Sequence, residues 1–89
     1  MAEISLDIHF TGFKQVRLVL TRDAQQLDAV DFGFDSNLDT VLIDSIDKLL
    51  KKNTIDPLTL HSVNVTGDVD ENSSAYKVAK ACAEAIKSL

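Results

Sequence analysis

The chain has one cysteine, no long apolar run and no basic stretch at its start, and each of these features excludes a class of protein. Its only cysteine, Cys82, excludes an internal disulfide and a cysteine-rich zinc site. No apolar run approaches the roughly 20 residues that a membrane-spanning helix needs. The first ten residues lack the basic and apolar stretches of a secretory signal. We therefore expect a cytoplasmic protein without a membrane partner, in which Cys82 is a small core residue rather than a reactive thiol.

Positive charge and glycine are also scarce. Nine Lys and Arg stand against 14 Asp and Glu, and the formal net charge of −5 disfavours direct binding of nucleic acid or anionic lipid. Only three glycines are present, and Gly67 alone stands where a phosphate-binding loop would be expected, between a strand and a helix. The acidic Asp68, Asp70 and Glu71 that follow it would repel a phosphate. The sequence predicts no nucleotide and no other cofactor.

What the sequence does have is enough apolar residues, 45%, for one domain over residues 1–89. Ile4, Leu6, Ile8 and Phe10 alternate with polar residues, which predicts a strand with one buried face. Residues 15–21 and 27–34 alternate in the same way, with a bulge expected near Asp28. Short connections, the first a turn at Gly12, join the three segments. They therefore predict an antiparallel meander.

The periodicity then becomes helical. Residues 36–52 predict a helix that begins with a capping box at Ser36, and residues 60–65 predict a short strand. A last helix begins at Ser73 or Ser74. The order β-β-β-α-β-α needs a crossover connection, which predicts a mixed sheet of order 3-2-1-4. This α/β arrangement resembles the ribonuclease-H-like fold without its fifth strand, so residues 60–65 form an edge strand open to pairing.

Both predicted helices are more apolar than a helix that only covers a sheet. On a helical wheel the apolar arc of the first spans about 200°, twice the stripe of a surface helix. Either this width is used inside the monomer, or the outer edges bind another protein or a second copy. In the second case the interface comprises Val41, Ile43, Ile46, Leu50, Tyr76, Lys80 and Ala83. Ile43, Leu50 and Tyr76 are expected at its outward edge.

Catalytic chemistry has two weaker candidates. Asp7 in the first strand, Asp44 in the first helix and Asp68 after the fourth strand match the places where ribonuclease-H-like nucleases hold divalent metal ions. His9 and His61 lie on strands expected to be neighbours. The simpler interpretation is that these are surface residues in a chain with 14 acids, so no catalytic or metal-binding residue is assigned.

Three segments carry a resemblance to a known family. VLIDSIDKLL (residues 41–50), LHSVNV (60–65) and SSAYKVAKA (73–81) resemble the N-terminal lobe of the TsaB (YeaZ) family, in the actin-like ATPase and ribonuclease-H-like superfamily. The opening hairpin, with Asp7, is similar as well. The resemblance implies a non-catalytic subunit that pairs with the enzyme TsaD through its two N-lobe helices. It would support threonylcarbamoyladenosine modification of tRNA.

Three hypotheses follow. The leading one is a single-lobe, TsaB-like scaffold that forms a homodimer, or a heterodimer with a TsaD-like protein, through its two helices. The second is a minimal metal-dependent ribonuclease-H-like enzyme. The third is a homodimeric binding module with an unrelated role.

Overall fold

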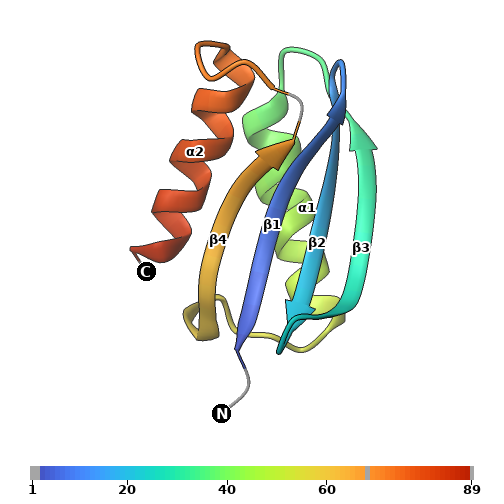
Figure 1. Cartoon of the computed structure of the whole chain (residues 1–89), viewed down its shortest axis with the longest axis vertical. Coiled ribbons are helices and arrows are strands. Elements are labelled where there is room, and N and C mark those ends of the chain that lie inside the picture. Colours follow the sequence, from blue (N-terminus) through green and yellow to red (C-terminus); the bar gives the residue numbers. More distant parts are fainter. Residues whose placement is uncertain (1–2, 68, 89) are drawn as a thin grey trace.

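The computed structural model describes residues 3–67 and 69–88 and contains the predicted order of elements (Figure 1). The strands are β1 (Ile4–Gly12), β2 (Gln15–Arg22), β3 (Gln25–Gly33) and β4 (Leu60–Gly67). The helices are α1 (Leu38–Lys52), the short 3-10 helix η1 (Pro57–Thr59) and α2 (Ser74–Lys87). The α/β class and the element order are confirmed.

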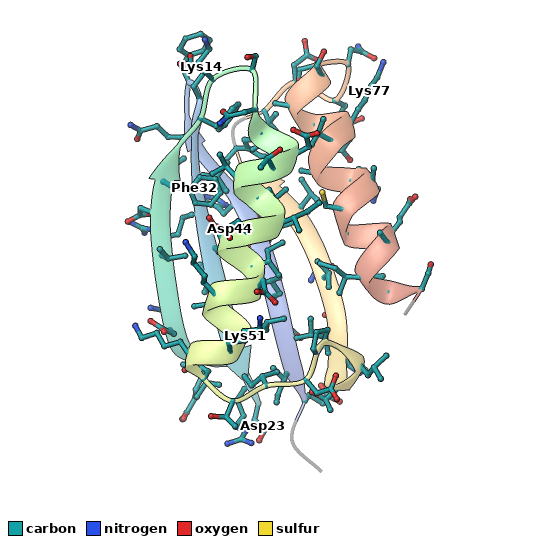
Figure 2. The ribbon with its side chains drawn as sticks, turned by 180° about the vertical axis from the view of Figure 1, so that it is seen from behind. Lys14, Asp23, Phe32, Asp44, Lys51 and Lys77 are labelled. Carbon is teal, nitrogen blue, oxygen red and sulfur yellow. The ribbon has the colours of Figure 1, made fainter. Side chains whose placement is uncertain are left out.

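The four strands form one sheet in the order β3-β2-β1-β4, as predicted. The pairs β1–β2 and β2–β3 are antiparallel, whereas β1–β4 is parallel. Both helices lie on the same face of the sheet (Figures 1 and 2). One sheet face is therefore covered by helices and the other, which we call the open face, is not.

The core fills the space between the sheet and the two helices. The strand alternation decides which side chains enter it, because successive residues of a strand point to opposite faces. On the sheet the buried residues are Ile4, Leu6, Ile8, Phe10, Val16, Leu18, Leu20 and Val63. On the helices they are Leu38, Leu42, Ile46, Leu49, Leu50, Ala79, Cys82 and Ala83. All of them are hydrophobic, and the alternating pattern in the sequence predicted the strand members of this set.

One turn and one bulge lie close to, but not at, the predicted residues. β1 continues through Gly12, and the left-handed backbone of the first hairpin lies at Lys14, with φ 56°. The register between β2 and β3 shifts so that Leu27 is the extra residue, which places the bulge beside the predicted Asp28. At the end of β4, Gly67 has φ 100°, and a Cβ there would overlap the backbone of β1. A glycine is therefore required at that position.

The helix ends are held by different means. The Ser73 hydroxyl accepts a hydrogen bond from the Tyr76 N–H at 3.1 Å, so the predicted start of α2 is confirmed. The capping box predicted at Ser36 is wrong, because α1 begins after Asn37, whose side chain caps no helical N–H. The Asn37 amide oxygen instead accepts a bond from the Asp35 N–H, since the chain is still turning out of β3 there.

Candidate functional site

A groove of about 410 Å³ lies between α1 and α2. We call it the helix groove. It is lined by Ile43, Ile46, Asp47 and Leu50 of α1, Pro57 of η1, and Ala81, Cys82, Ala85 and Ile86 of α2. Asp47 is the only charged residue among them. The two helices lie side by side over the sheet in Figure 2, where Asp44 labels the middle of α1. The groove is thus an almost wholly apolar surface feature formed by both helices.

The predicted interface residues divide into two sets. Ile43, Ile46 and Leu50 line the helix groove. The other four do not: Val41 faces a second hollow beside the loop after β3, and Tyr76, Lys80 and Ala83 are absent from the lining. Three of the four residues named on the first helix therefore lie on one surface. Their role as an interface stays a prediction.

The outward position predicted for Leu50 is wrong. Its side chain is only 2% exposed, and Ile46 and Ala83 are buried as well. The reason is that α1 has two neighbours, the sheet and α2, which use different sectors of its wheel. Most of the 200° apolar arc is therefore used inside the monomer. Ile43 remains outward, at 60% exposure, and Tyr76 is half-buried.

Sequence reasoning missed the α2 side of the groove. Ala81 and Ala85 are exposed and one helical turn apart on the same face. Their small side chains leave the hollow that larger residues would fill. The alanine spacing was the available signal, because small residues one turn apart let another helix approach closely.

Charged residues of α1 flank the groove, and the buried thiol of Cys82 forms part of its lining. Asp44 pairs with Lys48 at 2.9 Å and Asp47 with Lys51 at 3.0 Å, and all four side chains are exposed. Such i,i+4 pairs contribute only a few tenths of a kcal/mol. Burial raises the pKa of the Cys82 thiol, and the negative charge of Asp39 raises it further. Cys82 is therefore a buried core residue, as predicted.

Asp7 and Asp44, two of the three acids in the weaker metal-binding alternative, do not lie together. Asp7 lies on the open face of β1, whereas Asp44 lies on α1, which covers the opposite face. The sheet separates the two carboxylates, since strand alternation sends Asp7 away from the core. Asp68 is outside the described residues. Within residues 3–67 and 69–88, no group of three His, Cys, Asp or Glu is placed to hold a metal ion.

The open face instead carries a small polar network. The Thr66 hydroxyl donates to the Asp7 carboxylate at 2.9 Å, and its oxygen lies 2.9 Å from Nδ1 of His9. A hydroxyl has one proton, so the His9 ring donates the second bond. The His9–His61 pair, to which the sequence assigned no role, does not form, because His9 pairs in register with Thr66 while His61 lies at the other end of β4.

These features define an α/β protein with a four-stranded mixed sheet, one face covered by two helices, of the ribonuclease-H-like kind. Its fold matches that of YeaZ from Pseudomonas aeruginosa with a TM-score of 0.75 at 11% sequence identity. The match covers 94% of this chain and 38% of that chain. The predicted likeness to YeaZ is thus confirmed for the fold, and the chain spans well under half of that protein.

Two further comparisons bear on the same question. No family model and no curated protein matches the sequence. Among the described residues, no helix is long and apolar enough to cross a membrane.

Proposed function

We propose that this protein is a non-catalytic, partner-binding subunit. Its partner is a TsaD-like enzyme of tRNA threonylcarbamoyladenosine modification in the cytoplasm, and its interface is the helix groove. The observation that carries the proposal is the apolar groove between α1 and α2, beside which Ile43 is 60% exposed. A hydrophobic groove is the kind of surface into which an amphipathic helix of a partner lays its apolar face.

The shape of the groove fits a helix better than a loop or a small polar ligand. Two helices form its walls, and Ala81 and Ala85 on one wall allow a partner backbone to come close. Helices pack with axes about 8–10 Å apart when small side chains meet larger ones across the contact. A partner helix lying along the groove would complete a bundle with α1 and α2, with Leu50 and Ile46 as its floor.

The likeness to YeaZ supports the choice of partner class. In the resemblance given by the sequence, the same two helices pair the subunit with its enzyme. The chain corresponds to 38% of YeaZ, so the activities and partners of that whole protein enter only as part of this proposal. The separation of Asp7 from Asp44 by the sheet supports a role without metal-dependent catalysis by that set.

The proposal is tested by Ile43→Asp, with Leu58→Asp as the matched control. Both leucine-sized side chains are mostly exposed, 60% and 66%, but only Ile43 lines the groove. Each variant is co-expressed with a TsaD-like protein from the same genome, and the complex is weighed by light scattering on a sizing column. We expect Ile43→Asp to lose the complex while Leu58→Asp keeps it. Equal behaviour of the two variants, or no complex with the unaltered chain, contradicts the proposal.

A second copy of the chain is the alternative occupant. Ile43 projects next to the groove of its own protomer, so one surface carries both an apolar knob and an apolar hollow. A two-fold arrangement would place each Ile43 in the groove of the other copy, as self-complementary interfaces require. A particle of twice 9.8 kDa that Ile43→Asp converts to a monomer would favour this arrangement.

A further inference from the structure

The free edge of β4 is a second surface, separate from the helix groove. β4 pairs with β1 on one side, and no described strand lies on its other side. In such an edge strand every second residue points its N–H and C=O outward, away from the sheet. Another extended chain can form hydrogen bonds with those N–H and C=O groups.

This edge lacks the features by which proteins block strand pairing. Residues 60–67 contain no charged residue and no proline, and the register with β1 is regular from Ser62 to Gly67. The opposite edge, β3, is different. It has a bulge at Leu27 and exposed or half-buried acids at Asp31 and Asp28. The contrast within one sheet singles out β4 as the edge open to pairing.

Helix α2 covers one face of the sheet next to this edge. In both views α2 lies toward the outer side of β4, and it packs against β4 (Figures 1 and 2). At 100° per residue, Tyr76 and Ala83 fall on the flank of α2 away from the groove-lining Ala81 and Ala85. A strand added to β4 would lie under this flank with its apolar side chains toward it.

The flank also carries two lysines, with the exposed Glu84 beside them. Lys80 and Lys87 fall on the same side of the wheel as Ala83 and are exposed. Neither forms a salt bridge with the described residues. The two lysines begin about 10 Å apart along the helix, close to the roughly 13 Å between residues i and i+4 of a strand. Acids at that spacing match Lys80 and Lys87 in both charge and separation.

We propose that the free edge of β4 binds an extended acidic segment of a partner protein by strand addition. The segment pairs its backbone with β4, sets a small apolar side chain under this flank of α2, and places two carboxylates near Lys80 and Lys87. Its recognition element is acid-x-apolar-x-acid in an extended conformation. This surface is independent of the helix groove, so the segment and a groove-bound helix can be held at once.

The probe for this proposal is a fluorescein-labelled nine-residue peptide, Thr-Val-Thr-Glu-Thr-Val-Thr-Glu-Thr, titrated by fluorescence anisotropy. Lys80→Gln combined with Lys87→Gln should weaken binding about fivefold or more. Lys48→Gln combined with Lys51→Gln removes the same total charge from α1 and should change it less than about twofold. Ile43→Asp should leave peptide binding intact, which separates this proposal from the proposed function.

Backbone pairing is tested with two N-methylated versions of the peptide, one altered at the odd residues and one at the even residues. Since only one set of N–H groups faces β4, one version should lose binding and the other should keep it. Hydrogen exchange should slow at alternate amides of β4. Equal binding by both versions, equal weakening by the two lysine pairs, or a β4 edge covered by a second copy that the peptide cannot displace would overturn the proposal.

Discussion

Asp28 of β3 accepts a hydrogen bond from the Asn53 amide at the end of α1, 3.0 Å away. The same carboxylate accepts from the N–H of Ala29 and lies 3.3 Å from the Lys52 ammonium. Asn53 in turn donates to the carbonyl of Leu49 in the last turn of α1. Asp28 therefore connects the C-terminal end of α1 to the bulged edge strand β3. The Asp28 side chain is only 20% exposed.

This contact predicts a pH dependence of stability. The Asn53 hydrogen bond, the Ala29 N–H and then Lys52 hold the pKa of Asp28 below its usual 3.8. A carboxyl whose pKa is depressed on folding stabilises the fold above its unfolded pKa, and this contribution is lost as the pH falls through the folded value. Asp28→Asn should therefore lower the urea midpoint at pH 7, and the deficit should shrink below about pH 3.8.

Asp44→Asn is the control for that measurement. Asp44 is an exposed member of an i,i+4 pair with Lys48, so its loss should move the midpoint far less than Asp28→Asn at pH 7. A deficit in Asp28→Asn that stays constant down to pH 2 would contradict the role given to the carboxylate.

The burial of Leu50 separates the monomer core from the groove surface. Leu50→Ala should lower the free energy of unfolding by about 2–5 kcal/mol, because it leaves a cavity under α1. Ile43→Ala, at a side chain 60% exposed, should change it by less than about 0.5 kcal/mol. Urea denaturation followed by circular dichroism measures both, and similar losses for the two variants would refute the burial difference.

Gly67 is required by its backbone conformation. Gly67→Ala combines a positive φ of 100° with a Cβ that overlaps the backbone of Phe10, so we expect destabilisation by more than about 1 kcal/mol. Gly12→Ala is the matched control, because a Cβ at that position meets nothing within 4 Å. In thermal unfolding, the midpoint temperature of Gly12→Ala should lie well above that of Gly67→Ala.

The Cys82 thiol should react slowly in the folded protein. Burial first, and then Asp39, raise its pKa above 9.0, and the thiolate is the reactive form. Alkylation by iodoacetamide at pH 8 should therefore be much slower in buffer than in 8 M urea. Asp39→Asn should speed the folded-state reaction slightly by removing the smaller cause. A folded rate equal to that in urea would show that the thiol is accessible.

Much of the fold could be predicted from local pattern. Period-two alternation in residues 4–10 sends Leu6 and Ile8 inward and Asp7 and His9 outward whatever the rest of the chain does. The change to helical periodicity after residue 36, followed by one more strand, leaves few ways to arrange the sheet. The order of strands and the cap at Ser73 were predictable for these reasons.

The candidate site was only partly predictable. A helical wheel shows how wide the apolar arc of α1 is, but not how much of it neighbouring elements cover. Leu50 and Ile43 are both apolar residues of one helix, and only the packing of α2 and the sheet makes one 2% and the other 60% exposed. The distance between Asp7 and Asp44 likewise depends on which sheet face α1 covers.

By itself, the sequence determined which residues form strands and helices, which faces are apolar, and that the protein carries an excess of acid, since these depend on neighbours along the chain. Only the tertiary structure decided that Leu50 belongs to the core, that His9 meets Thr66 and not His61, and that α2 packs against β4. Such contacts join residues far apart in sequence, and they are fixed by how the layers pack and not by local preference.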